Sequence, residues 1–305
     1  MQIFDHPQLH LDNDAHTYTY KGQKFISVSS LVRQIFPEFQ PDQVLDKNCV
    51  RWQSLGSKYY GKTRQDIKDI WDLASLEATK SGTALHEQIA KYLNTPEPGP
   101  KNPTSPEFLQ FIKFTQDFPL MFQLGRHIEK SIVLPSAELA GTFDLLLINE
   151  NTNECSLIDW KRTSKCMKNE KAFGRHAIWG PLSLVEDTRF NRYSLQLNFY
   201  RHILRLHYNL NVTEMLIVQF HPELPNYVIT KCPVIDKEIL EFYLSTDLEV
   251  NQCEYCSSEI SKGYDICRAC CLALDVIDAQ TLSPKADFVS AIYNFVTGLC
   301  YYLIA

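Results

Sequence analysis

The chain has 305 residues, of which 45% are hydrophobic and 22% are charged. This composition supports a sizeable folded core, and it excludes a mainly disordered chain or a fibrous one, since only 11 residues are Gly and 15 are Pro. The formal net charge of −6 excludes a uniformly basic protein that coats nucleic acid, but it allows a local contact with a polyanion.

The pattern of apolar residues predicts a mixed α/β chain. Two alternating runs joined by Lys21-Gly22 predict a hairpin, and Ser29-Ser30 predict the N-cap of the helix that follows. Ser105 before Pro106 predicts another helix start, and Glu129 is expected just before the next group of strands. The expected elements, in chain order, are strands over 16–20 and 23–28, helices over 31–36, within 38–75, over 76–93 and from 106 to near 119, strands over 132–134, 142–148 and 155–161, a helix over 193–208, strands over 215–221 and 227–232, and a helix over 236–244.

Two carboxylates and a lysine interrupt the most apolar of these strands. If 142–148 and 155–161 pair across a turn, Asp144 and Asp159 approach each other, and Asp159 and Lys161 share a face. Burial of such charges is costly without compensation, which a divalent cation such as Mg²⁺ or Mn²⁺ provides. An edge hairpin with a surface ion pair is the alternative, but the apolar residues on both sides favour a central hairpin.

Other polar residues are candidates for a metal ligand or for contacts with a substrate. His86 follows Gly82 on a predicted helix, where a single histidine is more often structural than a ligand. Gln196 and Tyr200 lie four residues apart and therefore share one helical stripe. An amide and a phenol placed in this way can contact a phosphate or a base, although a plain helix surface has the same pattern.

Taken in order, these residues resemble a known superfamily. Gly82-Thr83-x-x-His86, Glu129, Ala140-Gly141-Thr142-Phe143-Asp144, Ile158-Asp159-Trp160-Lys161 and Gln196-x-x-x-Tyr200 together resemble the PD-(D/E)XK nucleases. The order is more similar to their RecB-like branch, which includes the mitochondrial genome maintenance exonuclease. The resemblance covers about residues 16–235, and it lies in the five-part order rather than in any single motif.

The resemblance implies a restriction-endonuclease-like core, with a central mixed sheet flanked by helices, that hydrolyses DNA phosphodiester bonds, acting as an exonuclease on single strands or strand ends in replication, recombination or repair. It implies a Mg²⁺ or Mn²⁺ ion held by His86, Asp144, Asp159 and the carbonyl of Trp160. Lys161 would position the attacking water and stabilise the transition state, and Glu129 would be a further catalytic acid. The residues expected to bind the DNA are Gln196, Tyr200 and Arg162.

One stretch carries much of the positive charge. From Lys161 to Arg205 the sequence has ten basic and three acidic residues, a local charge of +7, so the rest of the chain carries −13. Such a block indicates a contact with a polyanion, with a merely solvated surface as the alternative. The segment between Lys161 and Gln196 is longer than the minimal family pattern, and we expect it to lie along the path of the nucleic acid.

A cluster of cysteines follows the core. Cys253-x2-Cys256 and Cys267-x2-Cys270, ten residues apart, have the spacing of a structural zinc site with four thiolate ligands. Some RecB-like nucleases instead hold an iron–sulfur cluster with one upstream cysteine, a part that Cys49 could play here. Zinc is the preferred assignment because the paired spacing completes a site without Cys49.

These patterns predict three segments: a nuclease domain over 1–245, a zinc module over 246–275 and an apolar helical tail over 276–305. The sequence has no signal-like, transit-like or membrane-spanning run, so we expect an intracellular protein without a membrane contact. DNA is the expected partner, together with a replication or recombination protein. The alternatives are a catalytically silent DNA-binding or scaffold protein and a zinc-ribbon transcription factor with a nuclease-like ancestor.

Overall fold

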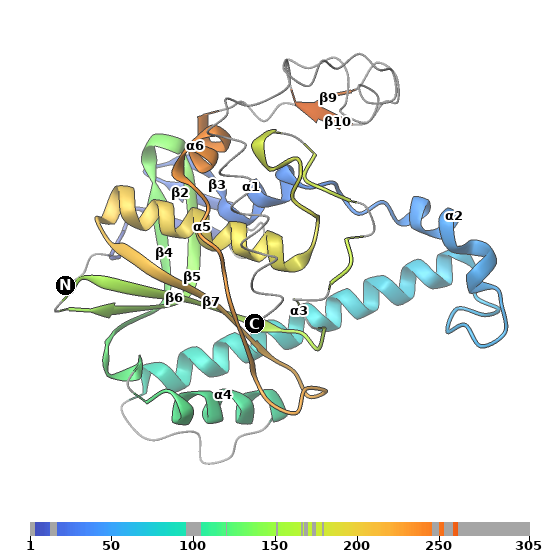
Figure 1. Ribbon diagram of the computed structural model, residues 1–305, viewed down its shortest axis with the longest axis horizontal. Helices are drawn as coiled ribbons and strands as arrows, with labels where there is room; N and C mark the ends of the chain where they lie inside the picture. The colour runs from blue at the N-terminus through green and yellow to red at the C-terminus, as the bar shows by residue number, and fades with distance from the viewer. Residues whose placement is uncertain are drawn as a thin grey trace.

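The structure is a computed structural model that describes residues 4–12, 17–95, 105–119, 121–150, 152–165, 167, 170–172, 175–178, 180–245, 250–252 and 259–261. Groups of strands and groups of helices follow one another along the chain, with one sheet at the centre (Figure 1). The elements are β1 (Leu9–Asp12), β2 (Thr17–Tyr20), β3 (Gln23–Ser27), α1 (Val28–Ile35), α2 (Pro41–Trp52), α3 (Arg64–Asn94), α4 (Pro106–Asp117), β4 (Gly125–Leu134), β5 (Leu139–Asn149), β6 (Glu154–Arg162), α5 (Arg189–Tyr208), β7 (Asn211–Phe220), β8 (Val228–Lys231), α6 (Lys237–Ser245), β9 (Val250–Gln252) and β10 (Glu259–Ser261).

The central sheet has eight strands of mixed direction and is built around β5. Strand β4 pairs with one edge of β5 along almost its whole length. The other edge is shared, because β3 runs parallel to β5 only as far as Ala140, and β6 pairs antiparallel with β5 only from Leu145 onward. Residues 141–144 of β5 therefore face a gap between two partner strands on this edge. The β5–β6 pair is central, as predicted.

Helices cover both faces of the sheet (Figure 1). On one face α1, α5 and α6 pack in a core that includes Val28, Leu195 and Leu240. On the other face α3 and α4 enclose a second core that includes Leu85, Phe111 and the Trp160 side chain. The predicted mixed α/β class with a central mixed sheet flanked by helices is confirmed.

Three local predictions are wrong in detail. The N-cap of α1 is Ser27, whose side chain accepts from the backbone N–H of Ser30, because β3 leads directly into the helix. Helix α3 begins at Arg64 rather than near residue 76. Strand β4 begins at Gly125, so Glu129 lies inside the strand rather than before it.

Helix α2 and the first part of α3 extend away from the sheet (Figure 1). We call residues 41–75 the helical arm. The arm has a small core of its own, in which Leu45, Tyr59 and Ile67 are buried and the rings of Trp52 and Trp71 pack around them. Trp71 Nε1 donates to the Tyr59 hydroxyl at 2.7 Å. The arm is therefore held in shape by packing within itself rather than by the sheet.

The start of α3 is fixed by a capping box. The Thr63 side chain accepts from the backbone N–H of Asp66, and the Asp66 carboxylate accepts from the backbone N–H of Thr63. Substitution Thr63→Ala removes one half of this pair, and we expect it to destabilise the arm by roughly 0.5–2 kcal/mol. Hydrogen exchange of the first turn of α3 measures this directly. Thr63→Ser keeps the cap and should exchange like the wild type; equal exchange rates in Thr63→Ala would contradict the prediction.

The C-terminal predictions concern a region that is mostly not described. The proposed zinc ligands Cys253, Cys256, Cys267 and Cys270 and the tail over 276–305 lie outside the described residues. Within residues 246–275 the structure describes β9 and β10, which pair antiparallel. None of the helices in the described ranges combines the length and the apolar character needed to cross a membrane.

Candidate metal centre

Asp144 and Asp159 lie where β5 and β6 part. At this end of the hairpin the last paired residues are Leu145 and Ile158. Asp144 comes directly before Leu145 on β5, and Asp159 comes directly after Ile158 on β6. Asp144 Oδ2 accepts from the backbone N–H of Trp160 at 2.7 Å, so this side chain takes the place of a strand partner. The gap in the sheet thus brings two carboxylates together in the interior.

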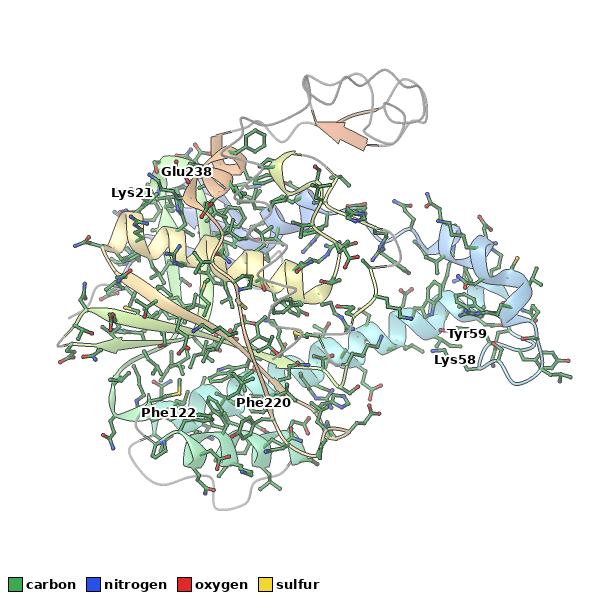
Figure 2. The ribbon with its side chains drawn as sticks, viewed as in Figure 1. Lys21, Lys58, Tyr59, Phe122, Phe220 and Glu238 are labelled. Atoms are coloured by element: carbon green, nitrogen blue, oxygen red, sulfur yellow. The ribbon has the colours of Figure 1, made fainter. Side chains whose placement is uncertain are left out.

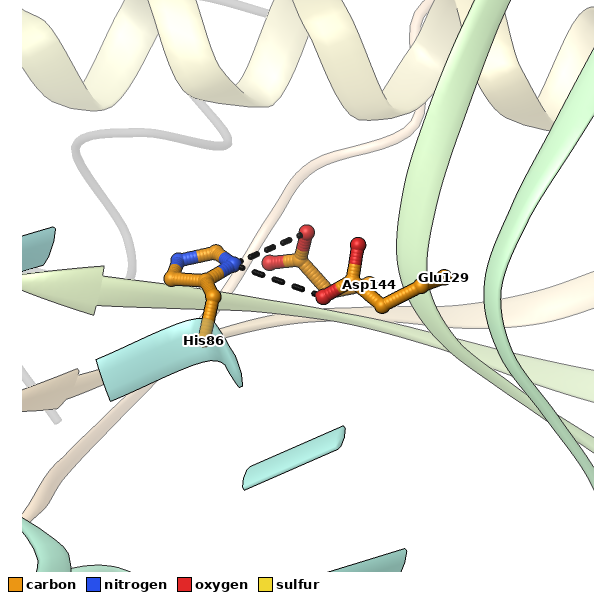
Figure 3. A group of neighbouring side chains, drawn as sticks. All are labelled: His86, Glu129 and Asp144. Atoms are coloured by element: carbon orange, nitrogen blue, oxygen red, sulfur yellow. Dashed lines mark ion pairs between the residues drawn. The ribbon is translucent and has the colours of Figure 1, made fainter. Parts of the chain in front are cut away.

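His86 reaches the same place from α3. Leu85 and Ile89 anchor this part of α3 in the second core. The imidazole Nε2 of His86 lies 3.1 Å from the carbonyl oxygen of Trp160, while its Nδ1 lies 3.4 Å from Asp144 Oδ1 (Figure 3). The helix therefore carries the histidine to the open end of the β5–β6 hairpin.

Glu129 completes the group from β4. The pairs on either side of it, Ile128 with Leu145 and Lys130 with Phe143, place Glu129 opposite Asp144. Its Oε1 lies 3.6 Å from His86 Nδ1 (Figure 3). The backbone φ of Glu129 is +48°, a left-handed conformation that is uncommon for a residue with a side chain and is concentrated at functional sites.

One atom from each of His86, Glu129 and Asp144 lies within 4.8 Å of the others. Oxygen ligands with one imidazole nitrogen suit a divalent cation such as Mn²⁺ or Mg²⁺. The structure thus brings together two of the three side chains predicted to ligate the metal, His86 and Asp144, with Glu129 as the third member of this group. Asp159 is not part of it.

Asp159 is instead paired with Lys161 on the same strand. Both side chains are largely buried, and Asp159 Oδ2 lies 2.6 Å from Lys161 Nζ. The ammonium group also lies over the ring of Tyr193 on α5, 4.7 Å from its centre. Asp159 and Lys161 share a face while the Trp160 side chain packs in the α3/α4 core, as strand alternation predicts. Tyr193, which lies three residues before Gln196, was not among the predicted site residues.

Burial and mutual interaction shift the pKa values of this cluster. Burial opposes the charge on His86, but the carboxylates of Asp144 and Glu129 outweigh it and raise the His86 pKa to about 10. Burial, opposed by Lys161 and reinforced by Asp144, raises the pKa of Asp159 to about 6. Burial likewise raises the pKa of Glu129. The pKa values of Asp159 and Glu129 rise because these carboxylates are buried close to another negative charge, that of Asp144.

Gln196 and Tyr200 lie on α5 and contact each other. Gln196 Nε2 donates to the Tyr200 hydroxyl at 2.9 Å, and Tyr200 is 3% exposed. Its ring lies against Gly141, in the β5 segment that faces the gap. The predicted helical stripe is confirmed, and it lies beside the strand that carries Asp144.

Gly141 leaves the space that the Tyr200 ring fills. A Cβ atom at this position would lie 2.5 Å from Tyr200 Cε1, which is shorter than the distance at which two non-bonded carbon atoms can pack. We therefore expect Gly141→Ala to destabilise the fold by about 1–3 kcal/mol, because the fully packed ring has to move. Chemical denaturation measures the change. The double variant Gly141→Ala/Tyr200→Ala should lose less free energy of unfolding than the sum of the losses in the two single variants. A loss equal to that sum would contradict the contact.

The guanidinium group of Arg162, predicted to bind DNA, pairs within the protein. Its Nε lies 2.7 Å from Oε1 of Glu107, a buried residue of α4. Glu107 was not predicted as a partner, because 55 positions separate the two residues. Other arginines of the basic block are also paired with acids: Arg175 and Arg192 with Asp187, and Arg189 with Glu170. These four arginines of the block are thus held in ion pairs within the protein.

Comparisons with known proteins give little guidance. No protein-family model matches the chain, and no curated protein matches it. A solved structure described as "Crystal structure of SSO0001" is similar with a TM-score of 0.30 and 10% sequence identity, over 72% of each chain. A likeness of this degree carries no argument about fold family or function, so the site has to be interpreted from its own chemistry.

Proposed function

We propose that this chain is a nuclease of the PD-(D/E)XK superfamily, in its RecB-like branch, that hydrolyses DNA phosphodiester bonds with Mg²⁺ or Mn²⁺, acting on single strands or strand ends. The observation that carries the proposal is the convergence of His86, Glu129 and Asp144 beside the buried Asp159–Lys161 pair. These residues come from four elements and occur in the order of the superfamily motifs. A role for the protein in replication, recombination or repair belongs to the same proposal.

The donor set fits a divalent cation. Asp144 is 8% and Asp159 is 4% exposed, and buried acids of this kind need a compensating charge. His86, Glu129 and Asp144 would hold the ion, and Asp159 lies close enough to contribute to its electrostatic environment. When bound, Mg²⁺ or Mn²⁺ would neutralise phosphate charge and lower the pKa of a bound water.

The other residues have roles that follow from their positions. Lys161, fixed by Asp159 and Tyr193, keeps an ammonium group beside the acids, where it can orient the attacking water and stabilise negative charge that develops on the phosphate. The backbone of Trp160 links Asp144 to His86 by one bond to each. Gln196 is suited to contact a strand near this centre, while the buried Tyr200 holds the Gln196 amide in place through its hydroxyl.

The proposal is tested with a fluorescent single-stranded DNA. Wild-type protein should release labelled products with Mg²⁺ or Mn²⁺ and none with EDTA. Lys161→Ala should lower the rate about 10²-fold, because charge stabilisation and water positioning are both weakened. An unchanged rate in Lys161→Ala would contradict the assigned site. DNA binding without cleavage under any divalent metal would favour a catalytically silent DNA-binding protein.

A further inference from the structure

The end of the helical arm carries basic side chains that form no ion pair among the described residues. From Lys47 to Lys62 the sequence has four basic residues and no acidic residue. All four are exposed, and none forms an ion pair with an acid among the described residues. We call residues 47–62 the basic tip; its charged members are Lys47, Arg51, Lys58 and Lys62. Arg64 and Lys68, just beyond the tip, are paired with Asp42 and Asp46.

The basic tip also exposes apolar and aromatic groups. Val50 is 86%, Leu55 is 85% and Tyr60 is 54% exposed. Beneath them Tyr59 is buried in the arm core, and Lys58 Nζ lies 4.7 Å from the centre of its ring (Figure 2). A surface that combines unpaired basic groups with an exposed ring suits a single-stranded nucleic acid, whose phosphates attract the charge and whose bases stack on the ring.

The tip keeps a defined shape, as a binding surface requires. Gln53 Nε2 donates to the carbonyl oxygen of Lys62, and the backbone N–H of Gly61 donates to Gln53 Oε1. These bonds tie the two ends of the loop after α2 to each other. The arm core, closed by the Trp71–Tyr59 hydrogen bond, supports the loop from below. The four basic groups are therefore presented on a fixed scaffold.

The arm and the metal centre share one helix. From Arg64 to His86, α3 rises by about 33 Å, because each helical residue adds about 1.5 Å. A single strand with about 3.4 Å per stacked nucleotide would cover that span with about ten nucleotides, and with fewer if it were stretched. A strand bound at the tip could thus reach the acids with its end.

From these observations we infer that the basic tip is a second binding site for single-stranded DNA, which holds the strand about ten nucleotides from the metal centre. This inference rests on the proposed function for its substrate, but its test needs no hydrolysis. The tip contrasts with the basic block over 161–205, where acids already pair with Arg162, Arg175, Arg189 and Arg192.

The test measures the salt dependence of binding to a labelled 30-nucleotide single strand in EDTA. The tip variant replaces each of the four basic residues by glutamine. Each lost phosphate contact should reduce the slope of log K against log salt by about 0.7, so four contacts reduce it by about 2.8. Between 50 and 200 mM salt the wild type should then lose about 50-fold more affinity than the variant. Tyr60→Ala should weaken binding roughly fivefold or more, and Tyr60→Phe should not.

A matched control separates a site from general charge. Four other exposed basic residues, none with an acidic partner among the described residues, are replaced by glutamine in the control variant: Lys24, Arg33, Arg126 and Arg205. The control should keep the wild-type slope. Equal slopes for the wild type and the tip variant would overturn the inference, and so would a control variant whose slope falls as much as that of the tip variant. Binding to anionic lipid vesicles is measured with the same proteins. A tip variant that loses binding to the vesicles but keeps its binding to the single strand would also overturn the inference.

The two proposals can fail separately. Tip-dependent binding of the 30-nucleotide strand by a protein that never cleaves DNA would overturn the proposed nuclease and leave the tip as a DNA-binding site. If the tip variant binds the strand as the wild type does, while cleavage still depends on Lys161, the tip is not a DNA-binding site. The proposed nuclease function would then remain. Circular dichroism of each variant checks that the arm remains helical, which is expected because the replaced side chains are exposed.

Discussion

Replacement of Asp144 by asparagine is expected to lower metal-dependent DNA hydrolysis about 10³-fold or more while the protein stays folded. The substitution removes a negative charge from the centre of the donor group, so it weakens both cation binding and the electrostatic stabilisation that depends on the cation. Asparagine is of similar size and its amide oxygen can still accept from the Trp160 N–H. The initial rate of product release from a labelled strand measures the effect.

A matched substitution at a second buried aspartate provides the control for this prediction. Asp187→Asn removes a buried carboxylate that pairs with Arg175 and Arg192 rather than with the metal centre. We expect it to lower stability, but to leave the rate per folded molecule much closer to that of the wild type. Wild-type rates in Asp144→Asn, or an equal loss of rate in Asp187→Asn, would remove the basis for assigning catalysis to this cluster.

Trp160→Ala is expected to destabilise the protein by about 3–5 kcal/mol. The side chain is fully buried, and its ring packs edge-on against Phe111 at 5.7 Å and Phe114 at 5.8 Å, so truncation leaves a large cavity. The indole N–H is buried without a hydrogen-bond partner among the described residues, and Trp160→Phe removes it while keeping an aromatic ring. We therefore expect Trp160→Phe to cost less than about 1.5 kcal/mol.

Urea denaturation measures both changes. The result bears on the site because the backbone of the same residue bonds to Asp144 and to His86. The side chain holds this backbone from the opposite face of the sheet. A loss below about 1 kcal/mol in Trp160→Ala would show that the second core relaxes around the cavity, contrary to the packing described.

The sequence was most informative where the local pattern decides the structure. The Lys21-Gly22 turn and the alternation on both sides of it correctly predicted the β2–β3 hairpin. The apolar runs that flank Asp144 and Asp159 correctly placed both residues in the centre of the sheet. In each case the period of the side chains and a turn signal agree, so no distant contact is needed to choose the element.

Other features depend on contacts that a local pattern does not contain. The first half of β4, up to Lys130, is polar and partly exposed, so it lacks the alternation of a buried strand. The start of α3 packs mainly against other residues of the arm rather than against the sheet, and it therefore shows a weak apolar period. Ser27, Ser29 and Ser30 are equally suited by type to cap α1, and only the end of β3 selects Ser27.

The candidate site shows the same division. The positions of Asp144 and Asp159 follow from strand pairing, but the approach of His86 depends on how α3 crosses the sheet. The sequence did not indicate that Glu129, rather than Asp159, would lie within 4.8 Å of His86 and Asp144 as a third donor. Nor did it indicate that Arg162 would be paired with Glu107.

Binding of Mn²⁺ followed by electron paramagnetic resonance tests the central claim most directly. The protein is first treated with EDTA and then freed of chelator and metal, and free Mn²⁺ is measured during a titration. We predict one Mn²⁺ bound per wild-type chain at micromolar to millimolar concentration, and loss of that binding in both His86→Ala and Asp144→Asn. Equal Mn²⁺ binding by the wild type and these two variants, or no binding by the wild type in this range, would contradict a metal centre at this position.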